Sequence, residues 1–166
     1  MASTYEPIAT TTLSSTTTYV DFTSFSGYTD LILVVNALQS GTEDIKLRFN
    51  SDTGSNYSRT VLYGTGSAAG SLRESNQTNL GFSTYGSPGS TDANRATIIL
   101  NIFNYANNTT YKTVLSRASR ASQGTETEVG LWRSTAAITD IRVSPGFAAV
   151  TFSVGSTFTL YGIKAA

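Results

Sequence analysis

The chain has 166 residues and carries 11 basic and 11 acidic side chains, with no histidine and no cysteine. This length suits a single domain with its own apolar core. Because no basic block is available to neutralise phosphates, and no long apolar run or export-signal pattern occurs, we expect no nucleic-acid partner, no membrane span and no cleavable signal. The low share of charged residues, 13%, and the many threonines are typical of a β protein.

The first thirteen residues are predicted to form an extended arm outside the domain. Pro7 disfavours a helix start, and the run Thr10–Thr12 favours extended backbone. The arm holds few apolar residues, namely Tyr5, Ile8 and Leu13. We therefore expect residues 1–13 to gain order by lying on a partner, and residues 14–166 to form a single domain.

The rest of the chain shows short runs that are typical of β-strands and are separated by turn residues. The most apolar run lies within residues 30–38, which we predict to be a central strand covered on both faces. Residues 44–50 alternate, so that Lys46 and Arg48 are expected on a solvated face and the apolar residues between them in the core. The other strand candidates are residues 18–22, 57–63, 78–85, 95–105, 111–119, 125–133, 138–143 and 157–164.

No window longer than two turns shows apolar residues at helical spacing. Residues 64–70 read as a loop, and residues 67–74 could form at most one helical turn. About eight to ten short strands at regular spacing indicate an all-β fold, either a sandwich or a barrel.

The lack of histidine removes most kinds of catalytic site. A Ser-His-Asp triad, a Cys-His dyad and the usual zinc site all need a missing side chain, so we expect no enzymatic activity and no cofactor. Two carboxylates alone can hydrolyse a glycoside. The candidate pairs are Glu126 with Glu128, and Glu43 with Asp44. We favour a solvated strand face for Glu126 and Glu128, with Val129 and Leu131 contacting the core.

The segment from Asn50 to Asn56 superficially matches a calcium loop. Asn50, Asp52 and Asn56 offer oxygen ligands around Gly54, but the terminal acid of such a loop is missing. We therefore predict that Asp52 and Asn56 fix a hairpin turn through hydrogen bonds to the backbone, and that no metal binds there.

Aromatic residues beside turns are the candidates for partner contacts, because tyrosine is suited both to the edge of a core and to an interface. They are Tyr19, Tyr28, Tyr85 and Tyr111, to which the arm adds Tyr5, Ile8 and Leu13. The alternative for each tyrosine is a place at the edge of the core with a solvated hydroxyl group.

Four segments together resemble the small structural proteins of tailed bacteriophages, especially those that infect cyanobacteria. In residues 47–57 a Leu-Arg-Phe-Asn strand leads into an Asp-x-Gly-x-Asn-Tyr turn. The other similar segments are residues 3–10, 28–34 and 158–164. The resemblance implies a jelly-roll-like antiparallel sandwich mounted on a virion, often as a homotrimer, and it supplies no catalytic residues.

Two places on the virion agree with this resemblance. On the outer surface of the head, the protein would be a decoration or cement protein whose partner is the major capsid protein. In the tail, it would be a fibre or receptor-binding component that contacts a glycan of the host surface. The short chain favours the head.

Overall fold

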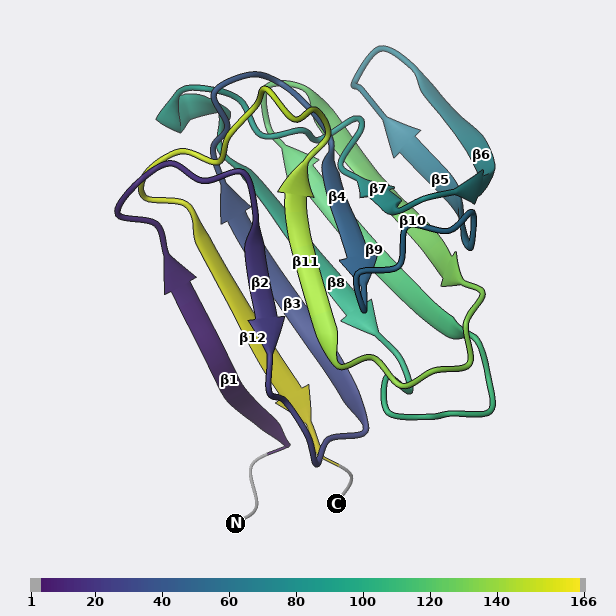
Figure 1. Ribbon diagram of the computed structural model, residues 1–166. Coiled ribbons are helices and arrows are strands. Elements are labelled where there is room, and N and C mark those ends of the chain that lie inside the picture. The colour runs from purple at the N-terminus through teal and green to yellow at the C-terminus, as the bar shows by residue number, and fades with distance from the viewer. Residues whose placement is uncertain (1–3, 165–166) are drawn as a thin grey trace.

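The fold is a sandwich of two antiparallel β-sheets (Figure 1). The computed structural model describes residues 4–164, which contain twelve strands and one short 3₁₀ turn, Asp92–Asn94. The strands are β1 (Tyr5–Thr12), β2 (Val20–Thr23), β3 (Asp30–Ala37), β4 (Ile45–Phe49), β5 (Tyr57–Gly64), β6 (Ala69–Gln77), β7 (Leu80–Phe82), β8 (Ala96–Ile102), β9 (Lys112–Arg120), β10 (Gly124–Trp132), β11 (Asp140–Pro145) and β12 (Thr157–Ile163). The expected all-β sandwich is confirmed, with more strands than the eight to ten predicted.

Eight of these strands have the order of a jelly roll. In chain order they are β1, β2, β3, β4, β7, β8, β11 and β12. Within the larger sheet four of them run β1-β12-β3-β8, and the smaller sheet runs β2-β11-β4-β7. The first strand thus pairs with the last, and most connections cross from one sheet to the other, as in two interlocked Greek keys.

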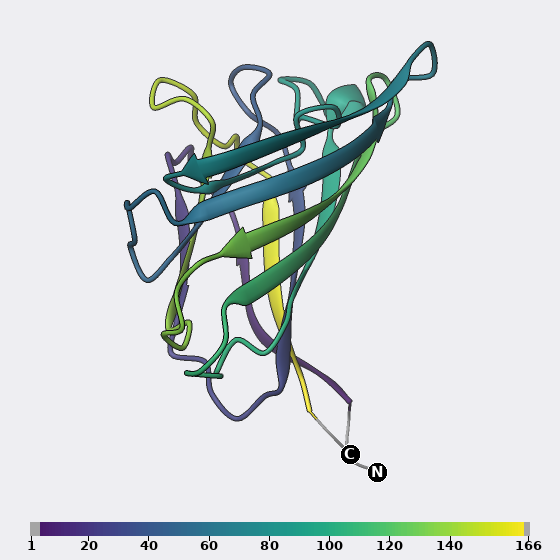
Figure 2. The ribbon, with the colours of Figure 1, turned by 90° about the vertical axis from the view of Figure 1, so that its right-hand side faces the viewer.

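Two inserted hairpins extend the larger sheet beyond the jelly roll. Hairpins β5–β6 and β9–β10 continue it in the order β8-β9-β10-β5-β6. Figure 2 shows that the extension twists, so that β5 and β6 lie across the direction of β3 and β12. From the smaller sheet, the short strand β7 contacts β10 and β5. The inner face of the extension therefore packs under β7 and not under a full second sheet.

The core lies between the two sheets and is filled by alternate residues of each strand. Leu31, Leu33 and Val35 of β3 are fully buried. Ile45, Leu47 and Phe49 of β4 are buried opposite them, as the alternation of that segment predicted.

One aromatic cluster closes the core where β4, β5 and β10 meet. The ring of Phe49 lies 5.5 Å from that of Trp132, and the ring of Tyr57 stacks on Trp132 at 6.3 Å. All three side chains are almost completely buried. Trp132 is the only tryptophan of the chain, so its fluorescence reports on this cluster.

Two expectations about strands are wrong. The segment 30–38 is not covered on both faces, because in a two-layer fold Ile32 and Val34 of β3 point away from the smaller sheet and are only half-buried. Most of the possible helical turn at residues 67–74 belongs to strand β6, which begins at Ala69 and whose pairing with β5 supplies the backbone hydrogen bonds that an isolated helical turn lacks.

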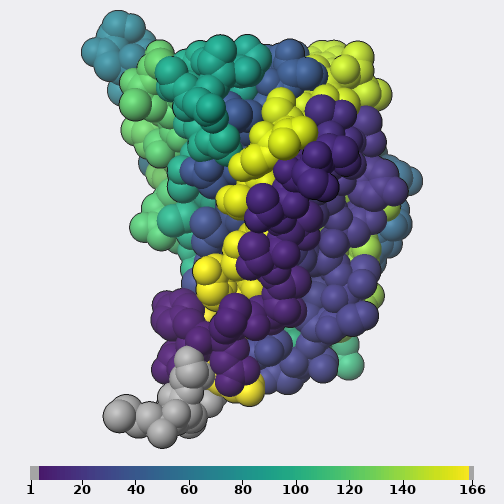
Figure 3. Space-filling view, turned by 90° about the vertical axis from the view of Figure 1, so that its left-hand side faces the viewer, coloured from purple at the N-terminus to yellow at the C-terminus, as the bar shows by residue number. Residues whose placement is uncertain are grey.

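The expected N-terminal arm is a strand of the domain. Residues Tyr5–Thr12 pair with β12 from Tyr5 opposite Ile163 to Thr12 opposite Thr157, and Figure 3 shows the purple segment of β1 running beside the yellow segment of β12. The register shifts next to Pro7. The proline is tolerated because β1 is an edge strand, where a missing N–H donor leaves no neighbour unpaired. Ile8 and Leu13 pack against the core. This segment is therefore ordered without a partner, whereas residues 1–3 of the arm lie outside the described residues.

We expect the substitution Ile8→Ala to lower the free energy of unfolding by about 1–2 kcal/mol, because it removes half-buried methyl groups from the edge of the core. Urea denaturation followed by Trp132 fluorescence measures this change. Thr12→Ala is the matched control on the exposed side of β1 and should change the value by less than about 0.5 kcal/mol. Equal stability of Ile8→Ala and the parent protein would contradict the placement of β1 in the domain.

Candidate interaction surfaces

The seven residues predicted to contact a partner do not form one surface. Tyr5 and Tyr28 lie near each other, since Tyr5 pairs with Ile163 and the ring of Tyr28 packs against Gly162 of the same strand. Tyr28 packs against the core, as do Ile8 and Leu13, so these three are mainly structural.

The other three tyrosines are spread over separate elements. Tyr85 stacks on Tyr63 of β5 with ring centroids 3.5 Å apart, which joins the loop after β7 to the inserted hairpin. Tyr111 precedes β9 and is 54% exposed, and Tyr19 precedes β2 with the guanidinium of Arg142 over its ring. The tyrosines alone therefore do not define an interface.

Exposed apolar side chains do gather on the outside of the larger sheet, around Arg117, which lies between Ile99 and Thr127. Leu62, Val129 and Leu115 are 57%, 50% and 37% exposed and come from β5, β10 and β9. Leu115 lies directly opposite Val129, and Val34 lies opposite Ile99, so apolar side chains meet across strand boundaries. We call this surface the outer apolar face; it consists of Ile32, Val34, Leu62, Ile99, Leu115, Val129 and Leu131.

The sequence-based orientation of β10 is wrong by one residue. Glu126 and Glu128 point into the sandwich and are 3% and 1% exposed, whereas Val129 points to solvent and Leu131 is half-buried on the same outer side. Trp132 shares its side of the strand with both glutamates, and its burial fixes the orientation of the whole strand. The position of the single tryptophan is the signal that could have predicted this.

Arg59 of β5 is the centre of the polar group that lies under β7. Its Nε donates to Glu74 at 2.6 Å, one terminal nitrogen donates to the carbonyl of Gly81, and the same nitrogen lies 3.5 Å from Glu128. Glu126 accepts hydrogen bonds from the backbone N–H groups of Thr84 and Tyr85. These contacts hold the loop after β7 against the inserted hairpins.

Glu128 is a neutral acid at neutral pH. Burial raises its pKa to about 9, and the nearby guanidinium of Arg59 offsets this only in part. Arg59 is already engaged by Glu74 at the shorter distance, and within residues 4–164 one carboxyl oxygen of Glu128 has no hydrogen-bond partner. Burial also raises the pKa of Glu126 and that of Asp44.

The burial of Glu126 and Glu128 keeps this first carboxylate pair from contacting a sugar substrate. A glycosidase needs both carboxyl groups in contact with the sugar, and Glu126 and Glu128 are enclosed between β10, β7 and the loop that follows it. In the second pair, the carboxyl group of Glu43 is half-buried, and burial raises the pKa of Asp44. The arrangement supports a structural role for the buried glutamates.

The Asp52 turn forms the expected hydrogen bond to its own backbone, but the predicted hairpin is wrong, because the turn joins β4 of the smaller sheet to β5 of the larger one. Its carboxylate accepts from the N–H of Gly54 at 2.8 Å, from Asn56 at 2.9 Å and from Nε1 of Trp132 at 2.7 Å. Burial opposes ionisation, but these donors outweigh it and lower the pKa of Asp52. Within residues 4–164, no group of three or more acidic, histidine or cysteine side chains could hold a metal ion.

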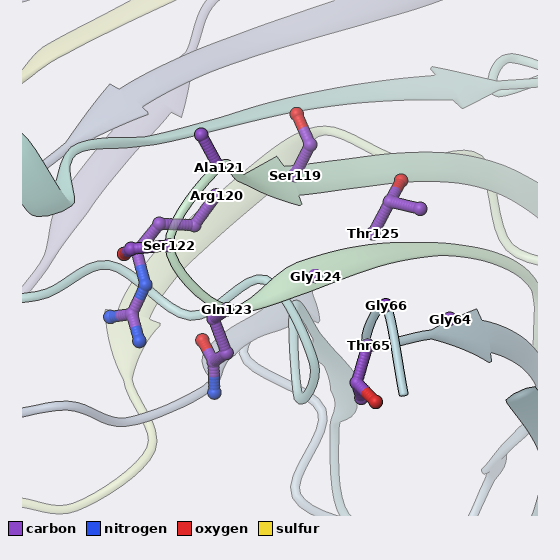
Figure 4. A pocket seen from close by; sticks show the side chains of 10 residues that line it. All are labelled: Gly64, Thr65, Gly66, Ser119, Arg120, Ala121, Ser122, Gln123, Gly124 and Thr125. Atoms are coloured by element: carbon purple, nitrogen blue, oxygen red, sulfur yellow. The ribbon is translucent and has the colours of Figure 1, made fainter. Parts of the chain in front are cut away.

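A depression of the surface lies between the β5–β6 and β9–β10 turns (Figure 4). This depression of about 490 Å³ is open and lined mainly by small residues, including Gly64, Thr65 and Gly124. In the close-up, Arg120 and Gln123 point to one side and Ser119 and Thr125 to the other, so their polar groups do not converge. The arrangement does not resemble a catalytic centre.

Comparison with known proteins does not assign a family. No protein-family model matches the chain, and no curated protein matches it. Among the described residues, no helix has the length and apolar character needed to cross a membrane. The surfaces of the fold are therefore the basis on which we propose a function.

We expect Glu128→Gln to stabilise the protein increasingly as pH rises from about 5 to 9. The folded-state pKa of Glu128 lies above the ordinary value of a glutamate, so the folded protein holds a proton that the unfolded chain releases. Stability is therefore lost as pH rises through this window, by at most about 1.4 kcal/mol per pH unit. Urea denaturation at pH 5, 7 and 9 measures the difference between variant and parent.

The matched control for this experiment is Asp92→Asn, because the side chain of Asp92 is 87% exposed. Its difference from the parent should stay constant over the same pH range. A Glu128→Gln difference that is equally constant would show that Glu128 is ionised in the folded protein.

Asp52→Ala should lower the free energy of unfolding by about 2–4 kcal/mol, because it leaves Trp132 Nε1 and two further donors without their acceptor. Asp52→Asn keeps one acceptor oxygen and should lose less. Thermal unfolding measures both changes, and millimolar calcium should leave the Tm of the parent unchanged. A calcium-dependent rise in Tm that Asp52→Asn abolishes would support the metal loop instead.

Proposed function

We propose that this chain is a structural protein of a tailed-bacteriophage virion, acting as a capsid decoration protein that binds and stabilises neighbouring major capsid subunits. The observation that carries the proposal is the outer apolar face, which leaves Leu62 and Val129 at least half exposed on a rigid sheet. Exposed apolar surface of this kind marks a site of contact with another macromolecule. The resemblance of four sequence segments to phage structural proteins supports the virion as its place.

The orientation of β10 strengthens the case for a covered surface. A half-buried strand normally points its apolar side chains inward and its charges outward. In β10, two glutamates point inward at a desolvation cost, while Val129 and Leu131 point outward. Covering the outer apolar face with a partner would contribute about half of the ~1.5–3 kcal/mol of full burial for each of these side chains, because they are already half-buried.

The charge on this surface favours a different protein over a second copy. Arg117 points outward from β9, two residues from Leu115, and the outward residues of β9, β10 and β5 include no carboxylate. Two copies packed face to face would bring two such arginines together without a partner. A capsid subunit that offers apolar residues and one carboxylate fits this face better.

Many weak attachments would give stable binding to a shell. A decoration protein that forms the expected homotrimer presents three copies of the face, so linked contacts multiply the affinity. Light scattering of the purified chain tests the proposed trimer. Copy number per virion tests the proposed place on the head: hundreds of copies support the head, and a few copies support the tail fibre or receptor-binding alternative.

The double variant Leu62→Asp/Val129→Asp should bind capsid shells that lack this chain at least tenfold more weakly than the parent, because charge replaces the exposed apolar contacts. Cosedimentation with purified shells measures the binding. Ser67→Asp, at the exposed β5–β6 turn, is the control and should bind like the parent. Unchanged binding by a folded double variant would refute the role of the outer apolar face.

A further inference from the structure

The outer face of the smaller sheet carries an unusual group of cations. Arg142 of β11 lies directly opposite Arg48 of β4, and Lys46 lies opposite Ser144 one step further along the same face. Side chains at such positions are about 5 Å apart at Cβ, and like charges placed there destabilise a sheet. The arrangement therefore calls for a compensating anion.

The three cations are not equally satisfied within the protein. Asp21 of β2 binds Arg142 through both carboxylate oxygens, at 2.7 and 2.6 Å, and Asp140 lies two residues before Arg142 on the same side of β11. Lys46 donates to the carbonyl of Gly146. Arg48 donates from Nε to the carbonyl of Thr78 at 3.3 Å, and within the described chain its terminal nitrogens have no hydrogen-bond partner. Arg48 is thus the cation with free donors: its charge also acts on the Asp52 carboxylate, but its terminal nitrogens remain available to a ligand.

Aromatic side chains border these cations. A groove of about 360 Å³ runs over the sheet between Tyr19 and Phe147, with Lys46, Arg48 and Arg142 on its floor. Phe147 is 65% exposed and Tyr19 is 46% exposed. The guanidinium of Arg142 covers one side of Tyr19 at 4.1 Å, which fixes that wall of the groove.

We propose that this groove binds an acidic polysaccharide, with a ring carboxylate on Arg48 and a sugar ring against Phe147. Guanidinium groups pair with carboxylates through two parallel hydrogen bonds, and the two free terminal nitrogens of Arg48 provide one bond directly. An exposed aromatic ring supplies apolar contact area for the C–H groups of a sugar ring.

The position of the groove favours a saccharide over an acidic peptide. Both β11 and β4 have neighbouring strands on either side, since the smaller sheet runs β2-β11-β4-β7. Their backbone groups are therefore engaged in the sheet and cannot pair with an added peptide strand. This excludes a peptide bound as an added strand, and the side chains of the floor can bind the carboxylates of a saccharide.

The site is separate from the surface proposed to bind the capsid. The groove lies on the outside of the smaller sheet and the outer apolar face on the outside of the larger one, so a particle-bound copy keeps the groove accessible. The inference does not depend on the proposed function, and each can fail alone.

Calorimetric titration of the full chain with oligogalacturonate tests this inference, with dextran and polyglutamate as the neutral and peptide probes. We expect oligogalacturonate to bind, with affinity that falls as salt rises, and the two other probes to bind at least tenfold more weakly. Arg48→Gln should weaken oligogalacturonate binding at least tenfold, and Phe147→Ala at least threefold. Arg117→Ala, on the opposite face, is the matched control and should bind like the parent.

A second readout separates a binding role from a structural one. Without ligand, Arg48→Gln should unfold at the same or a higher urea concentration than the parent, because it removes the repulsion from Arg142. Equal binding of dextran, stronger binding of polyglutamate, no binding of oligogalacturonate, or unchanged binding by Arg48→Gln would each overturn the inference.

Discussion

The burial of Trp132 is the constraint on which the rest of the structure depends. Its ring packs on Phe49 and Tyr57, and its Nε1 donates to Asp52 in the turn between β4 and β5. Because side chains alternate along a strand, this one placement decides where every other residue of β10 points. It turns the two glutamates inward and Val129 outward, and so creates both the buried polar group and the outer apolar face.

The cost of burying those glutamates is met by the inserted hairpins themselves. Arg59 on β5 connects Glu74, Gly81 and Glu128, while Glu126 holds two backbone N–H groups of the loop after β7. Protonation of Glu128 removes the remaining charge at neutral pH. Gly130 completes the fit, since a side chain there would meet Leu80 within 3 Å. The extension thus has a polar group enclosed on its inner side and exposed apolar residues on its outer side.

Much of the fold is predictable from local pattern, whereas the surfaces are not. The alternation around Ile45 and the turn chemistry of Asp52 depend on neighbouring residues, and both agree with the structure. The pairing of residues 5–12 with β12 joins the two ends of the chain, and no local signal marks it. The orientation of β10 likewise depends on contacts with β4 and β7. The local alternation predicts that Val129 faces the core, whereas it faces solvent. The opposition of Arg48 and Arg142 also arises only when β4 and β11 pair.

The most direct test of the central claim is a density map of the assembled virion at side-chain resolution. We predict that the outside of the larger sheet, at Leu62, Leu115 and Val129, lies against a major capsid subunit, while the outside of the smaller sheet faces solvent. A map in which these three side chains face open solvent would contradict the claim that the exposed apolar residues of β5, β9 and β10 exist for contact.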